Sequence, residues 1–352
     1  MKKLDTRKQL VAMTLGATLF ALGTHTNVSA ATFSSNPLFE VNNYTTTLSV
    51  SGDAADIYFP VNSNSATPRK FPIALMLQGA LVDKADYSNY ASQVAGYGFV
   101  VVVPNNFRTA PDPTGQEITG LIPEQQQVQN ILTEMVAENS NANSPVNNLV
   151  DTKTLGLLGH SLGAFVSLSA AQEEFCFPAI CTPGYQKPPE LKAVINYAGA
   201  FGNTQTQTFL PLNNGDTAIG LIAGSRDGVG IPLITRETYN QVQNPPKVLI
   251  TVEGANHYSI TNEDNLTREP NRPTLEQSIA TETIARWSGL FLRAHLLNDR
   301  DAFDYVYNTG DALDNNVSVI SEKQTIPEPS AAVALLAAGV ISLKLRGKSK
   351  HN

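Results

Sequence analysis

Short apolar runs alternate with segments of helical periodicity along most of the chain. The runs that we expect to form strands cover residues 44–50, 56–59, 72–77, 99–103, 153–158, 191–197, 217–223 and 247–252. The segments with helical patterning cover residues 86–97, 123–138, 162–172, 232–242 and 274–297. Some strand runs are apolar throughout, which is typical of strands buried on both faces. The alternation predicts an α/β fold with a mostly parallel central sheet covered by helices on both faces.

The first 30 residues have the three-part pattern of a secretory signal peptide. Basic residues stand at positions 2, 3, 7 and 8, an apolar run covers residues 10–22, and small residues at 28–30 form a cleavage site. The apolar run is short for a membrane span, which needs about 20 residues. A buried N-terminal helix is the alternative interpretation. The signal interpretation predicts export of a mature chain that begins near Ala31.

The last 30 residues, 323–352, have a second three-part pattern. Pro327-Glu328-Pro329 precedes an apolar stretch at residues 331–343, and basic residues follow at 344, 346, 348 and 350. This order resembles the PEP-CTERM sorting signal of exported bacterial proteins, and the resemblance implies a membrane sorting protease as a partner. A simple tail anchor is the alternative. A basic end tends to remain on the cytoplasmic side of the membrane. Both interpretations therefore place the body, residues 31–322, outside the cytoplasmic membrane: in the cell envelope, at the cell surface or in the medium.

The basic residues in the two terminal segments offset part of the negative charge of the body. The whole chain has a net charge of −7, whereas residues 31–343 hold 16 basic and 30 acidic residues, a net charge of −14. This balance argues against nucleic-acid binding, which uses a basic surface. Charged residues make up only 16% of the chain and hydrophobic residues 42%, which excludes a charge-rich disordered chain and a coiled coil. The body has neither an internal repeat nor a clear linker, so we expect one domain.

The clearest local motif is Gly159-His160-Ser161-Leu162-Gly163, between a predicted strand and a predicted helix. This is the G-x-S-x-G pattern of a nucleophile elbow in the strand–turn–helix setting that the motif requires. The turn forces the serine into a strained backbone conformation, and the glycines avoid clashes with the neighbouring strand and helix. Ser161 is therefore the candidate nucleophile. A tight turn without chemistry is the alternative interpretation.

Among the five histidines, His257 has the best position for a general base. It lies in the loop directly after the strand predicted at 247–252. His25 and His351 lie in the terminal segments, and His160 adjoins the candidate nucleophile. His295 lies inside the last predicted helix, where we expect a structural role.

Asp227 is the candidate acid of the same site. It follows the strand predicted at 217–223, and the chain order Ser, Asp, His is the order that this type of elbow uses. Its carboxylate is expected to hold the tautomer of His257 and to stabilise the imidazolium. Glu253 is the second candidate. A turn-forming Asp-Gly pair without catalytic role is the alternative for Asp227.

The loop after the strand predicted at 72–77 is expected to complete an oxyanion hole. Gly79 lets the backbone approach a substrate, and the N–H groups of Ala80 and Leu162 are the expected donors. Three loops are expected to surround the serine, at residues 105–122, 176–181 and 200–216; the last is either a mobile cap or a solvated insertion. The expected apolar contacts of an acyl or alcohol group are Leu81, Phe201 and Tyr258.

Cys176 and Cys181 are the two cysteines of the chain. In an exported protein such a pair predicts a disulfide that closes a short loop. A metal site needs further cysteine or histidine ligands close by, and the sequence offers none there. We therefore expect neither a metal nor a cofactor.

Together these segments resemble the α/β-hydrolase superfamily over residues 44–295. Within it, the chain is most similar to chlorophyllases, dienelactone-hydrolase-like esterases and polyester hydrolases, through residues 71–104, 159–163, 224–228 and 253–258. The resemblance implies hydrolysis of carboxylic esters through an acyl-enzyme without a cofactor. Gln78 stands where many members have histidine, and Leu162 where chlorophyllases often have arginine. Chlorophyll is therefore not taken as the substrate.

The sequence thus predicts an exported serine hydrolase that cleaves small-molecule, lipid or polymer esters. A peptidase or amidase with the same three residues is one alternative. A non-catalytic surface protein that uses the fold for binding is another, since fold alone does not fix function. A metalloenzyme is disfavoured, because only three histidines remain in the body.

Overall fold

The computed structural model describes residues 33–61, 69–111, 116–172, 182–199, 201–203 and 208–323. From Ser35 onward the described residues belong to one compact unit. The predicted signal peptide, almost all of the predicted sorting segment, and the predicted disulfide between Cys176 and Cys181 lie outside the described residues. Among the helices that the structure describes, none combines the length and the apolar character that a membrane span needs.

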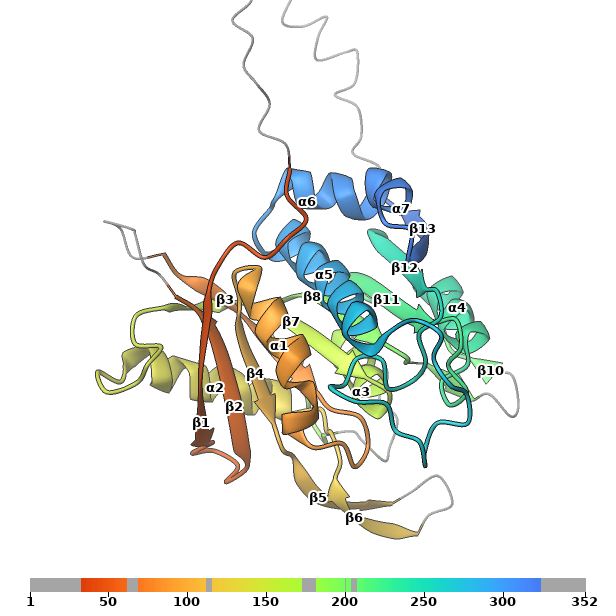
Figure 1. Cartoon of the computed structure of the whole chain (residues 1–352). Coiled ribbons are helices and arrows are strands. Elements are labelled where there is room, and N and C mark those ends of the chain that lie inside the picture. The colour runs from red at the N-terminus through yellow and green to blue at the C-terminus, as the bar shows by residue number, and fades with distance from the viewer. Residues whose placement is uncertain are drawn as a thin grey trace, which may run out of the picture. The chain divides into compact units, whose positions relative to one another are not determined.

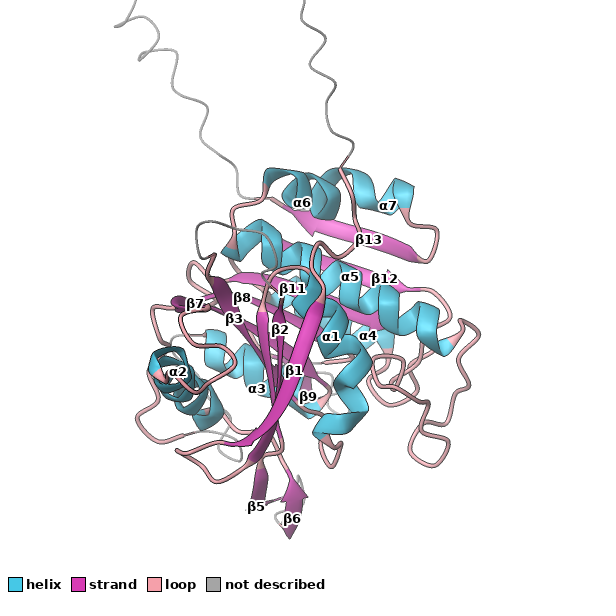
Figure 2. Cartoon of the chain, turned by 60° about the vertical axis from the view of Figure 1, so that its left-hand side comes forward, coloured by secondary structure: helices cyan, strands magenta, loops and turns pink. Residues whose placement is uncertain are grey.

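A nine-stranded sheet runs through this unit in the order β1-β2-β4-β3-β7-β8-β11-β12-β13 (Figures 1 and 2). The six central strands pair in parallel and are β4 (Val100–Pro104), β3 (Phe71–Leu77), β7 (Val150–His160), β8 (Leu191–Tyr197), β11 (Ala218–Gly224) and β12 (Lys247–Val252). Antiparallel strands form the two edges and are β1 (Val41–Thr47), β2 (Ala54–Pro60) and β13 (Val317–Glu322). The predicted, mostly parallel sheet is confirmed.

Helices cover both faces of the sheet, as the alternating pattern predicts (Figure 2). One face carries η1 (Lys84–Tyr87), α1 (Ser88–Gly96) and α5 (Gln277–Leu296). The other face carries α2 (Gln126–Ser140), α3 (Leu162–Ala171) and α4 (Pro232–Gln241). Successive side chains of β4 point to opposite faces of the sheet. Val100 and Val102 pack in the cluster under α2, α3 and α4. Val101 and Val103 lie outside that cluster and are equally buried. This explains why the strand is apolar throughout.

The structure adds several elements that the apolar pattern does not indicate. They are β5 (Phe107–Pro111), β6 (Glu117–Leu121), β9 (Gly202–Asn203), β10 (Thr208–Phe209), α6 (Arg300–Asp304), η2 (Tyr305–Thr309), α7 (Gly310–Leu313) and β13. The hairpin of β5 and β6 falls in a predicted loop because its pairing is partly polar, with the hydroxyls of Thr109 and Thr119 2.7 Å apart. β13 alternates buried and exposed positions at a sheet edge, so its sequence holds no continuous apolar run.

His295 has the structural role that its place in the last long helix predicts. Its Nε2 lies 2.9 Å from the hydroxyl of Tyr307, and its ring contacts those of Phe291, Phe303 and Tyr307. Burial among these rings lowers the pKa of His295 to about 4.

This histidine makes the stability of the protein depend on pH. Between pH 6.5 and pH 4 the unfolded chain binds a proton at His295 that the folded chain does not, so stability falls as the pH falls through this window. We predict that His295→Gln, which keeps a partner for Tyr307, lowers the slope of unfolding free energy against pH by about 1.4 kcal/mol per pH unit. Urea denaturation at several pH values measures it. Equal slopes for both proteins would contradict the assignment.

Candidate active site

The candidate residues lie at one edge of the sheet, where the parallel strands end. Ser161 directly follows β7, and Gly79 follows β3, the neighbour of β7. Asp227 and His257 follow β11 and β12, which pair with each other. Polar residues at the carboxyl ends of parallel strands meet in this way in open α/β sheets.

Ser161 has a backbone conformation that residues with a side chain rarely adopt. Its φ is 53° and its ψ is −116°, between the end of β7 and the first residue of α3. Its N–H donates to the carbonyl of Tyr197 at 3.1 Å, and its carbonyl accepts from the N–H of Ala164 at 3.0 Å. Both bonds hold the turn between strand and helix. The predicted strained elbow is present in the backbone.

The two glycines of the motif are required by close packing. A Cβ on Gly163 would lie 2.6 Å from the carbonyl oxygen of Gln78, and a Cβ on Gly159 would lie 2.7 Å from the Cα of Ala164. Contacts this short with backbone atoms force the backbone to move. The elbow therefore brings β7, α3 and the end of β3 together at distances that only glycine permits.

Asp227 and His257 form a buried pair. The Nδ1 of His257 lies 2.9 Å and 3.1 Å from the two carboxylate oxygens of Asp227, and each residue is 2% exposed. One of those oxygens also accepts from the N–H groups of Val229, at 2.8 Å, and Gly230, at 2.6 Å. The second candidate acid, Glu253, is exposed to solvent. The structure thus brings Asp227, and not Glu253, to the histidine.

Glu269 holds the two loops of this pair together and is not among the residues that the sequence analysis singles out. Its carboxylate is 1% exposed and accepts from the N–H groups of His257 at 3.0 Å, Gly228 at 3.2 and 3.3 Å, and Asn271 at 2.7 Å. A buried carboxylate needs such donors to offset the loss of water. Because its partners are backbone groups from three separate positions, no motif marks this residue.

The expected oxyanion donors have no partner inside the described part of the chain. Neither the N–H of Ala80 nor that of Leu162 donates to another described residue. The neighbouring N–H of Gly79 instead donates to the hydroxyl of Tyr87 at 2.8 Å, and a Cβ at Gly79 would lie 2.8 Å from His160 Nδ1. Ala80 lies in the loop after β3, and Leu162 is the first residue of α3.

The three expected apolar contacts differ in their surroundings. Leu81 has a φ of 58°, is 54% exposed, and donates its N–H to the carbonyl of Leu121 in the β5–β6 hairpin at 2.7 Å. The ring centroid of Tyr258 lies 5.3 Å from that of His257. Phe201 is fully buried and stacks on Phe165 at 5.0 Å, within the core under α3 and α4. The position of Phe201 is that of a packing residue.

Tyr87 and His160 form a buried chain of hydrogen bonds beneath these loops. The Tyr87 hydroxyl lies 2.8 Å from Nδ1 of His160, and Nε2 of His160 lies 2.9 Å from the carbonyl oxygen of His257. A carbonyl only accepts, so Nε2 carries the proton. Burial, with the neighbouring His257, lowers the pKa of His160 well below its usual value, so its Nδ1 accepts from Tyr87. The chain links the loop of Gly79 to the loop of His257.

Histidine, cysteine and carboxylate side chains do not gather in threes that could hold a metal ion anywhere in the described ranges.

The role of Glu269 in joining the loops is testable through stability. We predict that Glu269→Gln lowers the free energy of unfolding by about 3 kcal/mol, because an amide N–H₂ then faces backbone donors in a buried site. Urea denaturation measures this difference. Glu263→Gln, an exposed carboxylate on the same loop, is the matched control and should change stability by less than about 0.5 kcal/mol. Similar losses in both variants would contradict the proposed role.

The comparison with known proteins agrees with this geometry. No curated protein matches the sequence. A family model described as PET hydrolase-like matches residues 20–272, which is more than two thirds of the chain and includes Ser161, Asp227 and His257. Proteins of this family are carboxylic ester hydrolases of the serine type with the α/β-hydrolase fold, as the sequence predicts. The chain belongs to the PET hydrolase-like family and is an ester hydrolase.

Proposed function

We propose that the protein is an exported serine esterase whose catalytic triad is Ser161, His257 and Asp227. The observation that carries this proposal is the buried bond from Asp227 to Nδ1 of His257, at the edge of the sheet where a strained serine begins α3. A buried carboxylate on Nδ1 leaves Nε2 as the nitrogen that can accept a proton. The substrates are carboxylic esters, and the family makes polymer esters the first class to try.

The reaction proceeds through an acyl-enzyme. The Oγ of Ser161 attacks the ester carbonyl carbon while Nε2 of His257 takes its proton, and Asp227 stabilises the imidazolium. Collapse of the tetrahedral intermediate breaks the bond to the alcohol oxygen, which receives the proton from His257. Water then attacks the acyl-enzyme in the same way and releases the carboxylic acid. The net change is addition of one water across the ester bond.

We propose that the N–H groups of Ala80 and Leu162 donate hydrogen bonds to the oxyanion of both tetrahedral intermediates. Their lack of a partner within the described residues supports this role, because backbone donors aimed at developing charge are the usual content of an oxyanion hole. The first-turn position of Leu162 adds the positive end of α3. Leu81 and Tyr258 are proposed to contact the substrate, and Gly79 to keep the loop close to His160.

The domain boundaries and the export of the protein are part of the same proposal. Residues 1–30 act as the signal peptide, residues 31–322 form the catalytic domain, and residues 323–352 act as the sorting segment read by a membrane protease. The last strand of the sheet, β13, ends at Glu322, which supports the second boundary. Cys176 and Cys181 are proposed to pair after export.

The esterase proposal predicts the loss of turnover in one variant. Ser161→Ala should lower kcat on p-nitrophenyl esters at least about 10³-fold, because the nucleophile is lost while substrate binding remains. Esters of short and long acyl chains, together with a matched anilide, measure the rate and the type of bond. Ser140→Ala, at the exposed end of α2, is the control and should retain full activity.

Two results would contradict the proposal. Equal activity of Ser161→Ala and the wild type would exclude Ser161 as the nucleophile. A folded wild-type protein without turnover on any ester would favour the binding-protein alternative.

A further inference from the structure

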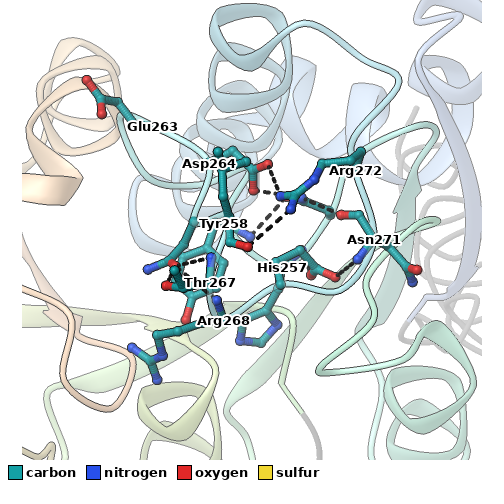
Figure 3. Close-up of polar contacts among 12 residues, drawn as sticks. His257, Tyr258, Glu263, Asp264, Thr267, Arg268, Asn271 and Arg272 are labelled. Atoms are coloured by element: carbon teal, nitrogen blue, oxygen red, sulfur yellow. Dashed lines mark hydrogen bonds and ion pairs between the residues drawn. The ribbon is translucent and has the colours of Figure 1, made fainter.

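The loop between β12 and α5 carries two arginines in opposite environments. Arg272 pairs with Asp264 at 3.4 Å, as Figure 3 shows. It also donates to the carbonyl of Leu266 at 3.1 Å. The guanidinium of Arg268 forms no ion pair or hydrogen bond with another described residue. The guanidinium lies over the ring of Tyr258, whose centroid is 5.7 Å from Cζ. The charge of Arg272 is therefore neutralised by its own loop, whereas the guanidinium of Arg268 has no anionic partner among the described residues.

Arg268 lies beside the site of ester cleavage. Tyr258, over whose ring the guanidinium of Arg268 lies, directly follows His257 in the chain, and the ring centroids of Tyr258 and His257 are 5.3 Å apart. Figure 3 shows the guanidinium of Arg268 and the imidazole of His257 projecting to the same side of the loop. Burial raises the pKa of both Tyr258 and Tyr87, and the charge of Arg268 acts against both rises. Its field thus reaches the oxyanion-loop side of the site as well.

The carboxylates around this arginine already have partners. Asp227 binds His257, Glu269 binds backbone N–H groups, and Asp264 binds Arg272 and Asn256. The rest of the body is acidic and repels anions, with a net charge of −14 over residues 31–343. A guanidinium on an aromatic ring is a favourable place for a carboxylate, which it can bind with two parallel hydrogen bonds.

We propose that Arg268 and Tyr258 form a carboxylate-binding subsite, so that the preferred substrates are esters with a free carboxylate, such as half-esters of dicarboxylic acids. This inference rests on the proposed function. Hydrolysis of an ester bond in a polymer leaves one carboxylate end and one hydroxyl end, so the enzyme's own products carry the group that the subsite binds. The subsite then favours further cleavage from acid-terminated fragments.

The test compares two esters that differ in one charge. The 4-nitrophenyl ester of adipic acid carries a free carboxylate, and its methyl-capped form is neutral. We expect Arg268→Gln to lower the ratio of kcat/KM for the charged ester to that for the neutral ester about tenfold, through KM. Arg268→Lys should keep part of the ratio, and added salt should lower it in the wild type. Arg272→Gln is the matched control and should leave the ratio unchanged.

The outcomes separate this inference from the proposed function. Turnover of the neutral ester by the wild type reports on the esterase alone. An unchanged ratio in Arg268→Gln, or an equal fall in Arg272→Gln, would overturn the subsite while the esterase stands. A wild type that hydrolyses neither ester would overturn both.

A second inference comes from the buried chain through Tyr87 and His160. The chain begins at the N–H of Gly79, beside the proposed donor Ala80, and ends at the carbonyl of His257. Tyr87 and His160 are fully buried, so each bond lacks competition from water. All the hydrogen bonds of the chain run in one direction: Gly79 donates to Tyr87, Tyr87 donates to His160, and His160 donates to the carbonyl of His257.

We infer that Tyr87 and His160 are positioning residues that set the distance between the oxyanion loop and the catalytic histidine. The rings of His160 and His257 lie 4.9 Å apart, so a second positive charge on His160 would oppose the imidazolium that forms on His257 during the reaction. A buried, neutral His160 that donates to the carbonyl of His257 avoids this repulsion and holds the loop.

Tyr87→Phe tests this inference, with Tyr90→Phe as its matched control. Both tyrosines are buried, and the hydroxyl of Tyr90 donates only to Ser288, away from the site. We expect kcat to fall about tenfold in Tyr87→Phe, with KM changed less than about threefold. Tyr90→Phe should lose about as much stability as Tyr87→Phe and keep the wild-type kcat. His160→Gln, which can accept and donate, should retain more kcat than His160→Leu. Equal kcat in the two tyrosine variants would overturn the inference.

Discussion

The backbone of Ser161 is the constraint on which the rest of the site depends. Its left-handed φ of 53° costs about 1–3 kcal/mol, and such a conformation persists only where its surroundings determine it. β7 on one side, α3 on the other and the end of β3 beneath supply those surroundings, at distances that require Gly159 and Gly163. The residue after Ser161 begins α3, and the N–H of that residue, Leu162, donates to no other residue in the described ranges. One strained residue therefore sets the positions of the proposed nucleophile and of one proposed oxyanion donor.

Buried hydrogen bonds connect the loops around this serine. Asp227 joins His257 and two N–H groups of its own turn, and Glu269 joins the loops that carry these two residues. The chain through Tyr87 and His160 joins the third loop. Each buried polar group needs its partner, so a shift of one loop leaves groups unpaired in the others. The loops consequently act as one rigid frame.

The sequence predicts those strands, helices and turns that a continuous apolar run, a helical periodicity or a short motif marks. The strands β8 and β12 have the predicted bounds, and the elbow at Ser161 follows from a motif in a strand–turn–helix setting. Glu269 escapes prediction because its partners are backbone groups at positions 228, 257 and 271. The β5–β6 hairpin and β13 escape it because exposed, partly polar strands lack an apolar run. Phe201 looks like a loop residue in sequence, and its packing on Phe165 depends on the tertiary fold.

The proposed triad requires that Ser161 is an activated nucleophile in the folded protein. Peptide mass spectrometry after reaction with a fluorophosphonate measures this directly, because the reagent labels serines that a neighbouring base activates. We expect one adduct per molecule, on the peptide that contains Ser161, and none after the protein is unfolded. A folded, ester-hydrolysing protein whose adduct lies on another residue, or that forms no adduct, would contradict it.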